Sequence, residues 1–206
     1  MTATLLPFAV PWQVRIGPIG NPHYQQIVSR PLFTPDVCAS IVSLNAHDAW
    51  ERAGITNDRL RAGGYDGKVR SADYQQLPND DRWPRHDLAT GLSEINAEVF
   101  RMDLDGLMDP DWPSVVRYDA NRADHFRPHQ DAGPMHPTRK LTFVVQLSAP
   151  DTYRGGDLVF PEVGSTAPRD QGELIAFPST IQHTVTPVID GSRHALVGWV
   201  HGSTLR

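Results

Sequence analysis

Prolines and glycines divide this sequence into short segments along its whole length. The 206 residues include 18 prolines and 16 glycines, and proline interrupts helices and central strands alike. After residue 112, five short β-prone runs follow one another at 114–118, 140–147, 157–160, 173–177 and 194–200. Turn signals separate these runs, among them the pairs Gly155-Gly156 and Asp190-Gly191. The second half is therefore predicted to be a set of short strands.

Two helices are predicted in the first half, after a proline-rich stretch over residues 1–33 that suggests short strands and loops. The first begins with a capping hydroxyl at Thr34, Pro35 at the first helical position and an acid at Asp36, and it is expected to end at Gly54. The second covers about 87–102, where apolar residues recur at helical spacing at Leu88, Leu92, Ile95 and Val99. Runs of helices followed by runs of strands predict a mostly β, α+β fold, either an antiparallel sandwich or a double-stranded jelly roll with supporting helices on one face.

Length and composition favour one domain over residues 1–206, with helical and strand support in 1–112 and a metal-binding β core in 113–201. The formal charge of -5 comes without a Lys/Arg run, which argues against a nucleic-acid or anionic membrane partner.

No apolar run approaches the ~18 residues of a membrane span. Cys38 is the single cysteine and is expected to be buried, and the N-terminus lacks a secretory signal. We therefore expect a cytoplasmic protein.

Six of the nine histidines lie between residues 125 and 201, in the β-rich half. His129 and Asp131 are two residues apart, and on a strand this spacing places both side chains on one face. Two imidazoles and one carboxylate on one face of a metal leave the opposite face open, as iron(II) oxygenases require. His183 is the best candidate for the second imidazole, because it begins a strand-like segment.

A hairpin turn is predicted at Asp190-Gly191, directly after that segment. On the returning strand, period-two counting places Arg193 on one face with Ala195, Val197 and Trp199. A buried guanidinium needs an anionic partner, and a dicarboxylate co-substrate would offer a planar one. Arg193 is therefore predicted to anchor a carboxylate. Trp199 would either form a wall of the metal pocket or belong to the core.

Over about residues 70–200 the sequence resembles the prolyl 4-hydroxylase-like group of the iron(II)/2-oxoglutarate-dependent dioxygenases. The resemblance rests on 118–126 leading into His129-Gln130-Asp131, on 141–147, on 155–158 and on the segment from His183 to Arg193. It implies a double-stranded β-helix fold, with Fe(II), 2-oxoglutarate and O2 as cofactor and co-substrates. It also favours hydroxylation over halogenation, because related halogenases lack the carboxylate ligand that Asp131 supplies.

The resemblance also implies roles for individual residues. His129, Asp131 and His183 match the iron ligands, and Arg193 matches the basic residue that binds the distal carboxylate of 2-oxoglutarate. Tyr118 matches a tyrosine beside the same co-substrate, and Gln146 occupies a position where relatives usually have a tyrosine that contacts it. On the substrate side, Arg70 is expected to meet an anionic group and His125 to contact substrate.

Three functions fit the sequence. The first is hydroxylation of an unactivated C–H bond in a small molecule, such as an amino acid or a biosynthetic intermediate, with release of succinate and CO2. The second is hydroxylation of peptidyl proline or another protein side chain. The loops at 56–82 would discriminate the two, because a peptide needs an open groove. The third is a non-enzymatic, cupin-like protein that binds zinc or nickel through His125, His129 and His183, which leaves Arg193 unexplained.

Overall fold

The computed structural model of the chain describes residues 26–44, 50–55, 64–109 and 111–203. Eight strands form a larger sheet, and their bounds are β1 (Val28–Pro31), β2 (Glu51–Arg52), β4 (Asp73–Gln76), β5 (Ser114–Asp119), β7 (Arg139–Gln146), β8 (Tyr153–Gly155), β11 (Glu173–Pro178) and β13 (Val188–His201). Five strands form a smaller sheet: β3 (Arg70–Ser71), β6 (His125–His129), β9 (Leu158–Phe160), β10 (Ser165–Thr166) and β12 (His183–Val185). The helical elements are α2 (Pro35–Ser43), α3 (Arg85–Ile95), the π-helical turn η2 (Asn96–Phe100) and the 3-10 turn η3 (Ala120–Arg122).

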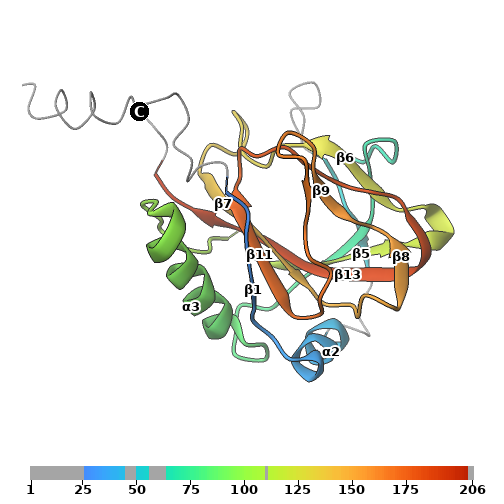
Figure 1. Cartoon of the computed structure of the whole chain (residues 1–206), viewed down its shortest axis with the longest axis horizontal. Coiled ribbons are helices and arrows are strands. Elements are labelled where there is room, and N and C mark those ends of the chain that lie inside the picture. Colours follow the sequence, from blue (N-terminus) through green and yellow to red (C-terminus); the bar gives the residue numbers. More distant parts are fainter. Residues whose placement is uncertain (1–25, 45–49, 56–63, 110, 204–206) are drawn as a thin grey trace, which may run out of the picture.

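The two sheets are antiparallel and form a double-stranded β-helix (Figure 1). The strand order of the larger sheet is β1-β11-β7-β13-β5-β4-β2, with β8 paired to β13, and that of the smaller sheet is β10-β9-β12-β6-β3. Both α2 and α3 pack against the larger sheet (Figure 1). The predicted fold class, a jelly roll supported by helices on one face, is confirmed.

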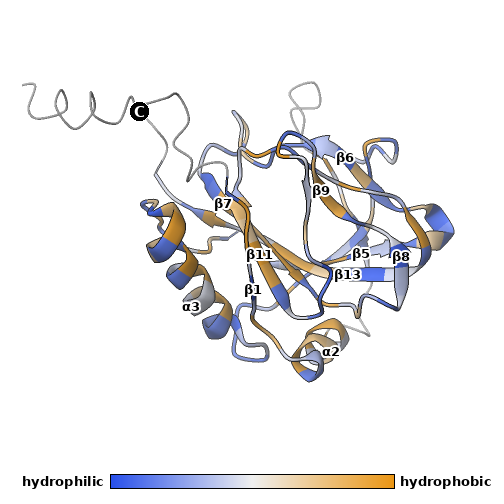
Figure 2. Ribbon diagram, in the orientation of Figure 1, coloured by the Kyte–Doolittle hydropathy of each residue, from blue (hydrophilic) through white to orange (hydrophobic). Residues whose placement is uncertain are grey.

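Both faces of the larger sheet are buried, and β7 shows how one strand serves both. Leu141, Phe143 and Val145 point towards the helices, whereas Val144 belongs to the second core, between the two sheets. Successive side chains of a strand point to opposite faces, so a strand that is covered on both faces reads as a continuous apolar run. Figure 2 shows β7 and β11 coloured mostly as hydrophobic. The face of β7 that carries Val144 also carries two polar residues, Thr142 and Gln146.

The first helix begins where the sequence predicts but ends earlier. The side chain of Thr34 accepts a hydrogen bond from the Val37 amide, and Pro35 is the first helical residue. The helix ends at Ser43, so the predicted end at Gly54 is wrong. Glu51 and Arg52 instead form the edge strand β2, whose pairing with β4 supplies hydrogen bonds that local propensity does not predict.

The second predicted helix is confirmed as α3 followed by the π-helical turn η2. Leu88, Leu92 and Ile95 are buried against the larger sheet. Arg101 ends the helical segment in a left-handed conformation, with φ of 54°. In the part of the chain that the structure describes, no helix has both the length and the apolar character needed to cross a membrane. The strands and loops predicted for residues 1–25 lie outside the described residues.

The predicted hairpin at Asp190-Gly191 is wrong, because β13 passes through this pair without reversing. Its first residues pair with β8, and from Ser192 onwards it pairs with β5. Gly191 has φ of 67°, and a Cβ atom there would lie 2.2 Å from the carbonyl oxygen of Thr152. The glycine therefore permits the close approach of β8 at a point where β13 changes its pairing partner.

Candidate metal centre and co-substrate pocket

His129 ends β6, His183 begins β12, and the two residues are cross-strand partners in the smaller sheet. The Nδ1 atom of His129 lies 2.8 Å from the carbonyl oxygen of Arg127, and that of His183 lies 3.1 Å from the carbonyl oxygen of Ile181. A carbonyl oxygen only accepts, so both Nδ1 atoms carry the hydrogen and donate it. Each Nε2 atom is left with a free lone pair, which is the arrangement of metal-binding histidines.

Asp131 lies just beyond the end of β6, not on the strand as the two-residue spacing predicted. The amides of Asp131 and Ala132 both donate to the carbonyl oxygen of Ser179, at 3.0 and 2.9 Å, and this pair of bonds turns the chain. Thr142 on β7 donates its hydroxyl hydrogen to Oδ2 of Asp131 at 2.8 Å, and the Ser179 hydroxyl lies 2.9 Å from that of Thr142. The carboxylate is therefore oriented by residues of the larger sheet.

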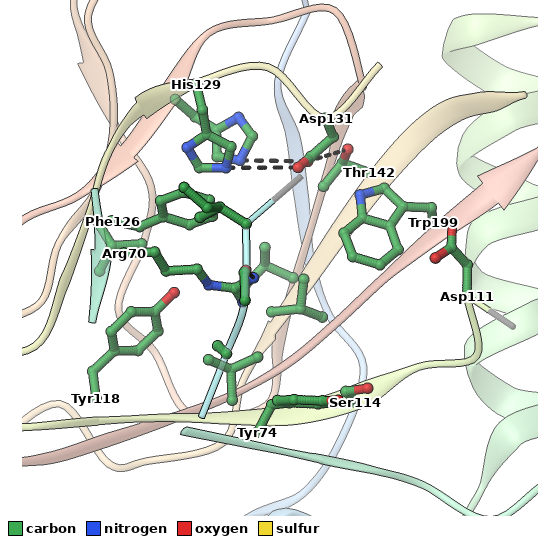
Figure 3. A pocket seen from close by; sticks show the side chains of 18 of the residues that line it. Arg70, Tyr74, Asp111, Ser114, Tyr118, Phe126, His129, Asp131, Thr142 and Trp199 are labelled. Atoms are coloured by element: carbon green, nitrogen blue, oxygen red, sulfur yellow. Dashed lines mark hydrogen bonds and ion pairs between the residues drawn. The ribbon is translucent and has the colours of Figure 1, made fainter. Parts of the chain in front are cut away.

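These three side chains meet in space, and Figure 3 shows His129 beside Asp131. Ligand atoms of His129, Asp131 and His183 all lie within 4.8 Å of one another. Nε2 of His129 is 3.6 Å from Oδ1 of Asp131, and Nε2 of His183 is 3.4 Å from Oδ2. Two ligands held ~2.1 Å from one ion at right angles lie about 3 Å apart, so small movements would close the cluster around a metal. Two imidazoles and one carboxylate suit iron(II) and leave positions for other ligands.

The charges of the cluster favour the protonation states that bind metal. Burial acts to raise the pKa of Asp131, but the neighbouring His183, His129 and the Thr142 hydroxyl outweigh it and hold that pKa well below its usual range. Burial lowers the pKa of His183, partly opposed by Asp131. An ionised carboxylate beside a neutral imidazole is the form in which both bind a metal.

Aromatic rings pack against both histidines. The ring of Phe126 stacks on His129 with centroids 3.4 Å apart, and Phe177 packs edge-on against His183 at 4.8 Å. These contacts fix the orientation of the imidazoles and keep water from their outer faces.

The cluster opens into a cavity of about 1000 Å³ between the sheets. Arg193 on β13 lines this cavity, and its side chain is only 1 % exposed. Its Nε and Nη2 atoms both donate to Oε1 of Gln146, at 3.1 and 2.9 Å, and its guanidinium carbon lies 5.6 Å from the ring centroid of Tyr118. Among the described residues, no carboxylate forms an ion pair with Arg193. The guanidinium is thus a buried cation with neutral partners, which is costly unless an anion joins it.

Its neighbours hold Arg193 in place. Tyr118 on β5 is its cross-strand partner and also lines the cavity. Gln146 is not among the lining residues that the structure describes, and its Nε2 atom donates to the carbonyl oxygen of Pro168 at 2.8 Å. Gln146 therefore supports Arg193 from behind, where the sequence predicted direct contact with the co-substrate. Gly156 lies against the other side, where a Cβ atom would sit 3.2 Å from Cδ of Arg193.

The residues predicted near substrate differ in position. Trp199 and Arg70 both line the cavity (Figure 3). His125 does not, within the described lining: its Nδ1 lies 3.0 Å from the carbonyl oxygen of Ala123, and its Nε2 lies 3.4 Å from that of Lys68. His125 thus has two backbone partners, and its contact with substrate stays a prediction.

Sequence reasoning missed Thr142 and Ser179, the residues that orient Asp131. A signal for Thr142 was present, because it is a polar residue in an apolar run and shares a strand face with Gln146. Ser179 gave no such signal, because its backbone carbonyl and its hydroxyl act through contacts with residues that are distant in the sequence.

No protein-family model matches the chain. Bacterial relatives named PKHD-type hydroxylases do match part of it. The relative from Prochlorococcus marinus (strain NATL2A) is 39% identical over 80 residues, which cover 37% of this chain and 36% of the relative. That from Gluconacetobacter diazotrophicus is 38% identical over 96 residues, or 42% of this chain and 41% of the relative. The chain thus matches well under half the length of these relatives.

Solved prolyl hydroxylases share the fold over nearly the whole chain. A Pseudomonas putida prolyl-4-hydroxylase superposes with a TM-score of 0.65 at 16% identity, covering 87% of this chain and 94% of that one. A Trichoplax adhaerens prolyl hydroxylase, solved in complex with a peptide fragment of the hypoxia inducible factor oxygen degradation domain, gives 0.69 at 14% identity, covering 96% and 94%. The relatives in sequence therefore confirm the resemblance to the prolyl 4-hydroxylase-like group of the iron(II)/2-oxoglutarate dioxygenases, and the neighbours in structure confirm its fold.

Proposed function

We propose that this chain is an iron(II)- and 2-oxoglutarate-dependent oxygenase that hydroxylates an unactivated C–H bond of a small molecule, with release of succinate and CO2. An amino acid or a biosynthetic intermediate is the expected kind of substrate. When bound, iron(II), 2-oxoglutarate and O2 would supply the oxidising chemistry, and the chain's own residues would supply binding and orientation.

The observation that carries this proposal is Arg193, a buried cation without a carboxylate partner among the described residues, in the same cavity as the His129, Asp131 and His183 cluster. A metal-binding barrel without a co-substrate has no use for such a cation. A dicarboxylate would bind the metal at one end and satisfy the guanidinium at the other.

Each residue has a defined task in the proposed reaction. His129 and His183 would offer Nε2 to the iron, because their Nδ1 hydrogens are held by backbone carbonyls. Asp131 would offer a carboxylate oxygen, with Thr142 keeping the other oxygen in place. Arg193 would bind the distal carboxylate of 2-oxoglutarate, and the aromatic walls of the cavity would limit the access of water to the metal.

The test is O2-dependent conversion of 2-oxoglutarate to succinate by iron-loaded protein, together with the weak visible absorption expected when iron(II) and 2-oxoglutarate bind anaerobically. Asp131→Ala should lose both signals. Arg193→Ala should keep iron binding and need a far higher 2-oxoglutarate concentration, whereas the exposed control His86→Ala should behave like the wild type. Absence of the anaerobic band from iron-loaded wild-type protein would refute the proposal.

Hydroxylation of a peptide is the second candidate, since one structural neighbour was solved with a peptide fragment. Succinate release across a panel of amino acids, pathway intermediates and short peptides separates the two. Turnover with peptides and not with free small molecules would replace the first candidate with the second.

A further inference from the structure

Arg70 is a second cation in the cavity wall, on the smaller sheet. It begins β3 and pairs with Phe126 on β6. Its guanidinium carbon lies 4.7 Å from the ring centroid of Phe126, and that ring stacks on His129. One aromatic ring therefore separates this positive charge from a predicted iron ligand. Figure 3 shows Arg70 and Phe126 together beside the metal cluster.

The charge of Arg70 has no carboxylate partner among the described residues. Its Nη1 atom donates to the carbonyl oxygen of Gly54 at 3.2 Å, and its Nε atom is buried with no hydrogen-bond partner within the described part of the chain. A guanidinium cannot lose its proton and cannot accept a hydrogen bond. It therefore stays a cation and a donor, and the carbonyl oxygen of Gly54 is its one hydrogen-bond acceptor among the described residues.

The carboxylates that line the same cavity are already engaged. Asp111 binds Nε and Nη2 of Arg139 at 2.7 Å each. Glu51 accepts a hydrogen bond from the Tyr74 hydroxyl at 2.8 Å. Arg52, the neighbouring arginine at the cavity wall, is paired with Asp73 at 2.7 Å. Arg70 differs from Arg139 and Arg52 in having no ion-pair partner among the residues that the structure describes.

The donors of the opposite wall point to the same kind of ligand. The indole Nε1 atoms of Trp112 and Trp199 are also buried without partners within the described chain, and both residues line the cavity. An indole nitrogen only donates. The wall opposite Arg70 therefore carries two further donors that no acceptor of the described chain satisfies, as expected beside a ligand that carries acceptors.

We infer that Arg70 binds a carboxylate or similar small oxyanion of the substrate, so that the substrate is a short acidic molecule. This inference rests on the proposed function and narrows its substrate class. Because only one ring lies between Arg70 and His129, the oxidised carbon is a few bonds from the anionic group. A free amino acid or a comparable small acid meets this requirement, whereas a residue inside a peptide presents a neutral amide at that distance.

The test uses matched acids and amides on protein that cannot turn over. Protein loaded with Mn(II) is first titrated with 2-oxoglutarate, and failure of that titration counts against the proposed function alone. The saturated complex is then titrated with N-acetyl amino acids that have small, aliphatic or aromatic side chains, and with their primary amides. Each pair differs in the charge of one terminal group, and the amide stands for a peptide.

The acid of the best-binding pair should bind about tenfold or more tightly than its amide. Arg70→Gln should bring that ratio close to one, Arg70→Lys should keep part of it, and the exposed control Arg82→Gln should leave it unchanged. The inference is overturned if the amides bind as tightly as the acids, if the ratio survives in Arg70→Gln, or if no compound binds at millimolar concentration. Unchanged affinity for 2-oxoglutarate in Arg70→Gln separates this site from Arg193.

Discussion

Replacing Gln146 with glutamate tests whether the positive charge of Arg193 is reserved for a co-substrate carboxylate. The amide oxygen of Gln146 accepts two hydrogen bonds from the guanidinium, at 3.1 and 2.9 Å. In Gln146→Glu a carboxylate oxygen would take the same position and neutralise the cation from within. 2-Oxoglutarate would then compete with an internal anion.

The size of the effect follows from the bonds involved. Hydrogen bonds to charged groups contribute about 1.5–3 kcal/mol, and about 1.4 kcal/mol corresponds to tenfold in affinity. Gln146→Glu is therefore expected to weaken 2-oxoglutarate binding by about tenfold to a hundredfold. In the wild type, the amide nitrogen of Gln146 donates to the carbonyl oxygen of Pro168 at 2.8 Å. The second carboxylate oxygen of the glutamate would face that carbonyl oxygen and lose the bond, so the thermal unfolding of the variant must be measured as well.

The assay is calorimetric titration of Mn(II)-loaded protein with 2-oxoglutarate, with Mn(II) affinity measured separately. Gln146→Leu is the matched control, because it removes the two hydrogen bonds without adding a charge. It should weaken 2-oxoglutarate binding less than Gln146→Glu does, and neither change should alter Mn(II) affinity. The reasoning is refuted if the glutamate variant binds 2-oxoglutarate as tightly as the wild type. It is also refuted if the leucine variant loses as much affinity as the glutamate variant, because neutralisation of Arg193 would then not control the affinity.

Three further changes test other contacts. Thr142→Val removes the hydroxyl that orients Asp131 and should lower Mn(II) affinity about tenfold to a hundredfold, measured by competition with a chelator. Gly156→Ala places a methyl group 2.8 Å from Val188 at a residue with φ of 65°. It should lower the free energy of unfolding, measured in urea, by about 1–3 kcal/mol. It should also weaken 2-oxoglutarate binding, while Mn(II) still binds. Burial, followed by the charge of Arg117, lowers the pKa of His194 to about 4 in the folded chain. Protonation of His194 therefore favours the unfolded chain, and the free energy of unfolding should fall as the pH is lowered from 6.5 to 4. His194→Gln should reduce that fall by roughly 3 kcal/mol, and an unchanged pH profile would exclude this cause.

Strand positions were predictable where the residues of the strand itself form an apolar, β-branched run. The runs that became β5, β7 and β11 are apolar and β-branched, and their burial on both faces makes the pattern continuous. The two-residue strands β2 and β3 were not predictable, because distant partners in β4 and β6 define them. Local propensity contains no information about such partners.

The direction of Arg193 was predicted correctly for a reason that was partly wrong. The inference used a hairpin at Asp190-Gly191, but β13 continues through this pair. Period-two alternation beyond Gly191 still places Arg193, Val197 and Trp199 towards the cavity, because alternation depends on the strand and not on the preceding turn. The turn signal failed because a glycine with positive φ also permits close packing, here of β8 against β13.

The candidate ligands are held by both sheets, which predicts a link between metal binding and stability. His129 and His183 belong to the smaller sheet. Asp131 is held by Thr142, within β7 of the larger sheet, and by Ser179, which directly follows β11 of the same sheet. An ion bound to all three ligands would connect the sheets at the mouth of the sandwich, and it would bind the folded chain alone.

At a concentration 100 times the dissociation constant, such a ligand adds about 2.7 kcal/mol to the free energy of unfolding. For a chain of this length that corresponds to a rise in Tm of about 5–10 °C. Mn(II) should produce this rise in the wild type and in the exposed control Asp151→Ala, but not in Asp131→Ala. A rise that persists in Asp131→Ala would mean that the metal binds without bridging the sheets, and the geometry of the cluster would then have to be assigned to another role.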